Sequence, residues 1–337
     1  RIFVAGGAGY IGSCTTEYLL DHGHEVTVFD ALLNGHRDAV DPRARFVQGN
    51  LSDLDSLRSA MKTASPEGVI HFAAFIEVGE SMKDPLKYFR NNVANAINLA
   101  QAAAECNARK IVFSSTAAVY GMPEHFPISE EEPKNPINPY GESKLMFEKV
   151  LSWQNKLMGL QYTALRYFNA AGATELHGED HHPETHLIPL VMQAAMGERK
   201  SISVFGEDYD TPDGTCIRDY IHVLDLAQAH LLALESDYCG ALNLGTGGGN
   251  SVRQVIDAPE TPHASSQTPP PQNASSDGNP TSRISTPSSN PPGSGGRPIR
   301  RDTTTGRNAP QPKTNLHPDA QEPLNPPGCL PPLALTA

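Results

Sequence analysis

A glycine-rich turn between a short apolar run and a helical pattern constrains the fold of this chain more than any other feature. The run is Arg1–Gly6 (RIFVAG), and glycines follow at positions 9 and 12. An apolar run of this kind is typical of a parallel strand buried on both faces. Gly6 allows the tight turn, Gly9 lets the backbone approach a pyrophosphate, and Gly12 lets helix and strand pack closely. The helix N-terminus offers N–H groups and a positive dipole end, so the pattern predicts dinucleotide binding.

Further apolar runs alternate with helical patterns along the chain. Pro85 and Pro139 each begin a long helix, the second running to about Lys156, because a proline at the first helical position loses no hydrogen bond. This alternation predicts an α/β fold with a doubly wound parallel sheet, of the Rossmann type. The other predicted strands are Glu25–Asp30, Arg45–Val47, Val69–Ala73, Lys110–Ser114 and Tyr162–Tyr167.

An acidic residue closes the second of these strands. Asp30 lies 18 residues after Gly12, where a carboxylate accepts hydrogen bonds from the ribose hydroxyls of adenosine. A carboxylate there would repel the 2′-phosphate of NADP, so NAD is the predicted cofactor. A strand-end Asp without a ligand is the plainer alternative, and Arg37 nearby keeps NADP open as a second choice.

The composition argues against several kinds of partner and site. A net charge of −12 disfavours nucleic acid and anionic membranes. No apolar run reaches the roughly 18 residues of a membrane helix, and no signal peptide precedes the first strand. Five scattered cysteines, none at zinc spacing from a histidine, predict free thiols, no metal site and a cytoplasmic location. The chain begins at Arg1 without Met, so we expect a few leading residues to be missing.

The character of the sequence changes near Asp257. Residues 259–337 hold 18 of the 29 prolines and no Phe, Tyr or Trp. Such a segment buries too little apolar area to offset its chain entropy. We therefore expect residues 258–337 to form a disordered or out-of-frame tail; the second is favoured because the change interrupts an amphipathic helix that begins at Ser251. Residues 1–170 are predicted to form an NAD-binding domain. Residues 171–257 are predicted to form a partial substrate-binding lobe, with a strand and a helix returning to that domain.

A Y-x-x-x-K pair lies on the helix that Pro139 begins. Tyr140 and Lys144 share one helix face because they are four residues apart. A phenol with a pKa of about 10 is a poor base at neutral pH, but a nearby ammonium and a positive nicotinamide ring would stabilise its phenolate. The fifth strand ends in Ser114-Ser115-Thr116, which supplies a hydroxyl for the same site. The alternative, a surface helix pair, is weakened by the glycine turn upstream.

These segments together resemble the extended short-chain dehydrogenases, and in finer detail the UDP-galactose 4-epimerases. The resemblance covers about residues 1–257. Its motifs are Gly6–Gly12, Val69–Met82, Asn91–Val93, Phe113–Gly121, Asn138–Lys144, Arg166–Asn169, Asp213–Val223 and Asn243–Gly247.

The resemblance implies a role for individual residues. Tyr140, Lys144 and Thr116 would be the catalytic set. The residues implied to bind NAD are Gly6, Gly9, Tyr10, Ile11, Gly12, Asp30, Asn34, Asn50, Leu51, Phe72, Ala73, Ala74, Asn92, Ser114, Tyr140, Lys144 and Tyr167. Those implied to bind the substrate are Thr116, Tyr140, Asn169, Leu187, Phe205 and Arg218, the last because its planar fork suits a phosphate.

The implied activity is the interconversion of UDP-galactose and UDP-glucose by inversion at C4 through a 4-keto intermediate, in a homodimer. Related dehydratases carry an acidic residue just after the catalytic hydroxyl, whereas Ala117 and Ala118 follow Thr116 here. The family's Arg-Arg-x-Gly-Asp stretch and its gate residue are absent from residues 258–337. Two alternatives therefore stay open: an inactive NAD-binding chain with a damaged sugar site, or a 4-epimerase of another UDP-sugar, a pentose or an N-acetylhexosamine.

Overall fold

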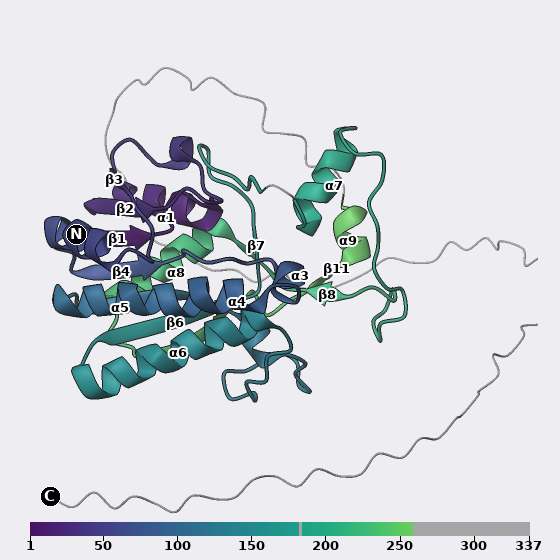
Figure 1. The fold of residues 1–337 in the computed structure, drawn as a ribbon. Helices are drawn as coiled ribbons and strands as arrows, with labels where there is room; N and C mark the ends of the chain where they lie inside the picture. Colours follow the sequence, from purple (N-terminus) through teal and green to yellow (C-terminus); the bar gives the residue numbers. More distant parts are fainter. Residues whose placement is uncertain (182–183, 259–337) are drawn as a thin grey trace, which may run out of the picture. The chain divides into compact units, whose positions relative to one another are not determined.

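The computed structural model describes residues 1–181 and 184–258 (Figure 1). In this part of the chain, seven parallel strands form one sheet in the order β10-β6-β5-β4-β1-β2-β3. The order starts from β1 and runs outward in both directions, which is the doubly wound topology that the sequence predicts. The strands are β1 (Ile2–Ala5), β2 (Val26–Asp30), β3 (Arg45–Gln48), β4 (Gly68–His71), β5 (Lys110–Thr116), β6 (Gln161–Tyr167) and β10 (Gly240–Leu244).

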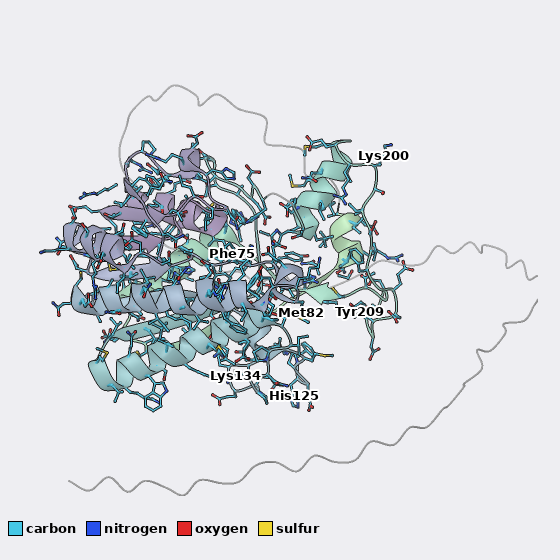
Figure 2. The ribbon with its side chains drawn as sticks, in the orientation of Figure 1. Phe75, Met82, His125, Lys134, Lys200 and Tyr209 are labelled. Carbon is cyan, nitrogen blue, oxygen red and sulfur yellow. The ribbon has the colours of Figure 1, made fainter. Side chains whose placement is uncertain are left out.

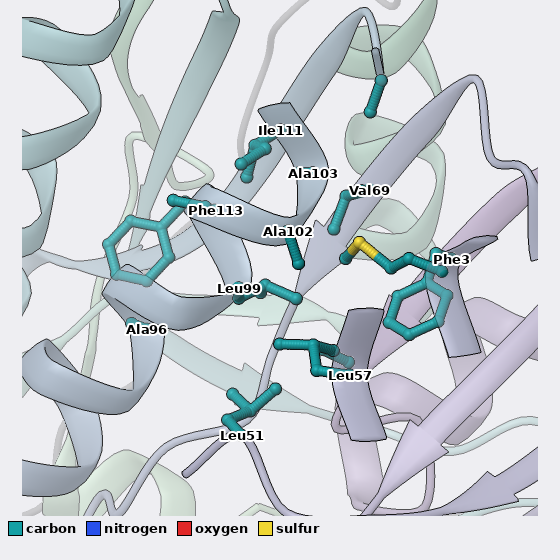
Figure 3. Packing of buried hydrophobic residues seen from close by; sticks show 14 of the residues in the cluster. Phe3, Leu51, Leu57, Val69, Ala96, Leu99, Ala102, Ala103, Ile111 and Phe113 are labelled. Atoms are coloured by element: carbon teal, nitrogen blue, oxygen red, sulfur yellow. The ribbon is translucent and has the colours of Figure 1, made fainter. Parts of the chain in front are cut away.

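The central strands are buried on both faces, because successive side chains point to opposite sides. In β1, Phe3 and Ala5 pack on one face, while Ile2 and Val4 pack on the other. Figure 3 shows the first of these cores, where Phe3 lies near Leu57 of an overlying helix. Short apolar runs without polar alternation follow directly from this two-sided burial.

Helices cover each face of the sheet (Figure 1). On the face of Ile2 and Val4 lie α1 (Tyr10–Asp21) and α8 (Val223–Glu235), which pack against each other. On the opposite face lie α2 (Leu54–Ala64), α5 (Asn95–Glu105) and α6 (Pro139–Met158). No helix in the described residues has the length and apolar character needed to cross a bilayer.

The predicted strands and the helix from Pro139 are confirmed, with ends that differ by one or two residues. The long helix predicted from Pro85 is confirmed and runs to Glu105, but its middle is not α-helical. Helix α4 (Pro85–Tyr88) passes into a π-helical segment, Phe89–Ala94, before α5 begins. The wider turn directs Asn92 inward, where its amide accepts from the N–H of Phe75 and donates to its carbonyl, each at 2.9 Å. Phe75 is labelled in Figure 2.

Shorter elements follow the sixth strand. Two short strand pairs lie in this region. One is parallel, between β7 (Asn169–Ala171) and β9 (Tyr220–His222), and the other is antiparallel, between β8 (Ile217–Arg218) and β11 (Asn250–Ser251). Helix α7 (Leu187–Ala195) lies between β7 and β8 in the sequence. Helix α9 (Val252–Ile256) begins at a capping box between Ser251 and Gln254. The predicted tail lies outside the described residues except for residue 258, and the domain limits at residues 170 and 257 stay predictions.

The contact between α1 and β1 leaves no room for a side chain at Gly12. A Cβ at Gly12 would lie 2.1 Å from the Gly6 carbonyl oxygen. We expect Gly12→Ala to lower the free energy of unfolding by about 1–3 kcal/mol, because α1 must move away from the strand. The measurement is urea unfolding of the protein stripped of ligands. Gly79→Ala is the control, because a Cβ at Gly79 meets no atom within 4 Å. Equal stability of the two variants would contradict this packing account.

Candidate active site

A large cavity lies along the carboxyl ends of the parallel strands. Its volume is about 1690 Å³, and its lining includes residues that follow or end β1, β2, β4, β5 and β6. Ligands of doubly wound sheets bind at this edge, because the strand ends and the following loops leave a crevice there. The elements after Asn169 contribute the other side of the cavity, through Leu187, Phe205 and Arg218.

The glycine turn forms one wall and fits a dinucleotide. Gly6 has φ of +86°, and a Cβ there would lie 2.4 Å from the Ala73 nitrogen, so the fold itself requires glycine. Gly9 is different: a Cβ there would meet nothing closer than the Gly6 carbonyl oxygen at 3.8 Å. Gly9 lines the cavity and begins α1 without a side-chain cap. The protein therefore leaves open space beside the helix N-terminus, as close approach of a phosphate requires.

Asp30 lies at the end of β2 with its carboxylate held by the backbone. One oxygen accepts from the N–H of Ala8 at 2.9 Å and the other from the N–H of Leu32 at 2.8 Å. Each oxygen keeps a further lone pair, and Asp30 lines the cavity. The carboxylate can therefore accept hydrogen bonds from two neighbouring hydroxyls, such as those of a ribose.

Tyr140, Lys144 and Thr116 converge on the same cavity. The Lys144 ammonium is buried, donates to the Ser114 carbonyl at 2.8 Å and lies 5.9 Å from the centre of the Tyr140 ring. The Thr116 hydroxyl caps the turn after β5 by accepting from the N–H of Ala118 at 3.1 Å. One helix and one strand end thus supply a phenol, an ammonium and a hydroxyl.

The electrostatics of this set are dominated by burial. Burial raises the pKa of Tyr140 above its usual value, while the neighbouring Thr116 hydroxyl acts in the opposite direction. Burial lowers the pKa of Lys144 to about 7, against an opposing effect of the Glu148 carboxylate. The protein alone therefore keeps the phenol protonated at neutral pH. A further positive charge beside the phenol would favour its phenolate.

The cavity brings together all but one of the residues that the resemblance singles out. Asn92 is the exception: it is buried, donates to the Ser143 hydroxyl at 3.2 Å and holds Phe75, which itself lines the cavity. The lining residues are Gly6, Gly9, Tyr10, Ile11, Gly12, Asp30, Asn34, Asn50, Leu51, Phe72, Ala73, Ala74, Ser114, Thr116, Tyr140, Lys144, Tyr167, Asn169, Leu187, Phe205 and Arg218.

The residues expected to hold the substrate differ in how firmly they are placed. Asn169 is fixed, because its amide donates to the Asp219 carbonyl at 2.8 Å. Leu187 is the first residue of α7, and Phe205 is 85% exposed. Arg218 forms no ion pair with any residue that the structure describes. Its guanidinium is therefore available to an anion in the cavity.

A polar cluster at the cavity was missed by the sequence reasoning. Potential ligand atoms of Glu179, His181, Glu184 and His186 lie within 4.8 Å of one another. His186 Nδ1 lies 2.9 Å from a carboxylate oxygen of both Glu179 and Glu184. The hydrogen bond with Glu179 raises the pKa of His186 to about 9. The recurrence of acidic residues and histidines over residues 179–186 was the available signal, and the expected absence of a metal stays a prediction.

Comparisons with known proteins agree with this geometry. The model of the NAD dependent epimerase/dehydratase family matches residues 2–245. A UDP-glucose 4-epimerase of Lacticaseibacillus casei is 51% identical over 263 residues, which are 76% of this chain and 80% of the relative. The structure of a Brucella ovis UDP-glucose 4-epimerase in complex with NAD is 50% identical, with a TM-score of 0.73, over 76% of this chain and 80% of the other.

A Bifidobacterium longum UDP-glucose 4-epimerase, solved in complex with NAD+ and UDP, is 39% identical with a TM-score of 0.72. The match covers 76% of this chain and 81% of the other. The family match, the doubly wound sheet and the glycine turn facing the cavity agree with one another. This chain belongs to the NAD dependent epimerase/dehydratase family.

Proposed function

We propose that this chain interconverts UDP-galactose and UDP-glucose by inverting C4 of the hexose, with NAD as its cofactor. The observation that carries the proposal is the convergence of Tyr140, Lys144 and Thr116 with the glycine turn in one cavity. Relatives at 46–51% identity over about four fifths of their length are named UDP-glucose 4-epimerases. These likenesses cover the strands and helices that carry the three side chains.

NAD, held by the glycine turn and Asp30, would supply the group that accepts the C4 hydride as NAD+ and gives it back as NADH to the other face of the sugar. Tyr140 removes the proton from the 4-hydroxyl and later gives it back. Thr116 hydrogen bonds the same oxygen. The Lys144 ammonium, held by the Ser114 carbonyl, favours the Tyr140 phenolate. Since Ala117 and Ala118 line the cavity beside Thr116 and carry no acid, these residues offer no proton for elimination of water.

The nucleotide end of the substrate would lie against the elements after β6. The Arg218 guanidinium, which forms no ion pair among the described residues, is suited to two oxygens of a diphosphate. Asn169 is held by Asp219 and presents a fixed amide. Leu187 and Phe205 offer apolar surface for the base. Holding the UDP end is what would let the hexose turn over between the two hydride transfers.

A homodimer is part of the proposal. Helices α5 and α6 pack side by side (Figure 1), and α6 exposes Met146, Trp153 and Leu157 along one stripe. Exposed apolar stripes of this kind are typical of helix-bundle interfaces. A cytoplasmic location and the lack of nucleic-acid and membrane partners stay predictions from charge and composition.

Replacing the phenol tests the function directly. We expect Tyr140→Phe to lower kcat for UDP-galactose by about 10²–10⁴-fold, because no other group at that position can take the 4-hydroxyl proton. The assay follows UDP-glucose formation by the purified protein without added NAD. Tyr18→Phe is the matched control, since Tyr18 stacks on His22 at 4.0 Å outside the cavity. Near-normal turnover of Tyr140→Phe would contradict the assignment.

Filling the space beside Gly9 tests whether NAD binds at the glycine turn. We expect Gly9→Val to lower the NAD released per chain on denaturation by about tenfold or more, because the side chain occupies the approach to the helix N-terminus. The fold should tolerate the change, since the nearest atom to a Cβ is 3.8 Å away. NAD content equal to that of the parent protein, with an unchanged melting temperature, would rule out pyrophosphate binding at this turn.

Charging the stripe on α6 tests the dimer. We expect Trp153→Glu/Leu157→Glu to convert a dimer into a monomer in light scattering at micromolar concentration, because buried unpaired carboxylates are costly. Leu232→Glu on α8 is the control: Leu232 is also exposed but lies on a different helix. A dimer mass for the Trp153→Glu/Leu157→Glu variant would show that this stripe takes no part in association.

A further inference from the structure

Helix α6 carries a buried carboxylate one turn beyond Lys144. Tyr140, Lys144 and Glu148 follow each other at intervals of four residues, so they share one face of the helix. Glu148 is 6% exposed. A carboxylate buried to this degree is stable only when it is paired and fully hydrogen-bonded. The sequence reasoning assigned no role to Glu148.

The partners of Glu148 lie on the two strands beneath α6. One carboxylate oxygen accepts from the Ser115 hydroxyl at 2.5 Å and from Arg166 Nε at 2.9 Å, and the other accepts from Arg166 Nη2 at 2.5 Å. Ser115 stands in β5 between Ser114, whose carbonyl holds Lys144, and Thr116. The Glu148 carboxylate therefore binds β5 at Ser115, between Ser114, which holds Lys144, and Thr116 of the catalytic set.

Arg166 extends the same contact across the sheet. It is paired with Ser115 in the register of β5 and β6, and its Nη1 donates to the Tyr120 hydroxyl at 2.8 Å. The Tyr120 hydroxyl in turn donates to the Asn243 side chain at 2.7 Å. The chain of bonds thus joins α6, β5, β6, the turn after β5 and β10. Since both charges are buried and paired, their geometry is tightly fixed.

We propose that Glu148 is a positioning residue for the reaction, which fixes the end of β5 against α6 so that Thr116, Lys144 and Tyr140 meet at the sugar. The inference rests on the proposed epimerase function. Through Ser115 the carboxylate sets where Thr116 lies. Through its place on α6, its negative charge favours the protonated form of Lys144.

The charges around Lys144 set the direction of the pH effect. Glu148 raises the pKa of Lys144, against the larger lowering by burial, which leaves it at about 7. His71 of β4 also faces the lysine, but burial lowers the pKa of His71 to about 3, so it is neutral in any assay. Arg166 carries the compensating charge on β6. Loss of the carboxylate alone must therefore move deprotonation of Lys144 to lower pH.

Three phenols also lie near this set in the part of the chain that the structure describes. Tyr167 of β6, Tyr120 of the turn after β5 and Tyr162 of β6 all have pKa values raised by burial, so they stay protonated at neutral pH. None of them can replace the charge of Glu148. The pH dependence of the reaction should therefore report on the Tyr140–Lys144 pair and on its coupling to Glu148.

The test is the pH profile of Glu148→Gln. We expect kcat for UDP-galactose to fall about tenfold with KM changed less than threefold, and the alkaline limb of the profile to move to lower pH. The double variant Glu148→Gln/Arg166→Gln removes both charges, so it leaves no unpaired guanidinium. Its alkaline limb should lie between those of the wild type and Glu148→Gln, because loss of the Arg166 charge partly offsets loss of the carboxylate, and it should recover stability against urea.

Lys110→Met is the matched control. Lys110 is the first residue of β5, at the opposite end of the strand from Thr116. Its side chain is fully buried and donates to the Ser236 and Tyr238 carbonyls at 2.8 and 2.7 Å. We expect it to lose stability and to keep the wild-type pH profile. If Glu148→Gln also keeps the wild-type kcat and profile, or if Lys110→Met shows the same changes, the positioning role is wrong.

A second readout separates this inference from the proposed function. The Lys144 ammonium can be titrated by nitrogen-15 NMR of lysine-labelled protein without substrate, with Lys144→Met to assign its signal. We expect Lys144 to lose its proton at lower pH in Glu148→Gln than in the parent protein, whether or not the parent turns over UDP-galactose. Identical titrations would overturn the coupling, while a parent protein without turnover would overturn only the proposed function.

Discussion

The burial of one parallel sheet on both faces is the constraint from which the rest of this structure follows. Side chains of β1 alternate between two cores, so neither face can carry polar chemistry without a large cost. Polar groups are therefore concentrated where the strands end. Asp30, Ser114 and Thr116 all lie at the carboxyl end of a strand, and the cavity runs along that edge. A site at this edge is a consequence of the topology before any ligand is considered.

Around the catalytic set, in contrast, charged side chains are buried between a helix and the sheet, and each is hydrogen-bonded there. Lys144 and Glu148 both belong to the buried face of α6, and each is anchored to β5, one through the Ser114 carbonyl and the other through the Ser115 hydroxyl. Arg166, which lies in β6, neutralises the negative charge of the Glu148 carboxylate. The helix cannot slide along the sheet without breaking these bonds. That rigidity is what a phenol and an ammonium from one helix and a hydroxyl from a strand end need in order to act on one oxygen.

Much of this could be predicted from the sequence, because the signals were local. The glycine turn, the apolar runs and the i, i+4 pair at Tyr140 and Lys144 each span a few residues. The features that were missed are non-local. Asn92 of the π-helical segment bonds Phe75, which is 17 residues away, and the pairing of Glu148 with Arg166 requires the register of two strands. The cluster around His186 depends on how a long polar loop folds back on itself.

The most direct test of the central claim is the fate of deuterium placed at C4 of UDP-galactose. In the proposed reaction a hydride leaves C4 and returns to the same carbon, while Tyr140 handles only the hydroxyl proton. We therefore expect the purified protein to form UDP-glucose with the deuterium retained at C4 and without added NAD. Exchange of the deuterium with solvent, or no conversion by protein that carries its full complement of NAD, would contradict the account.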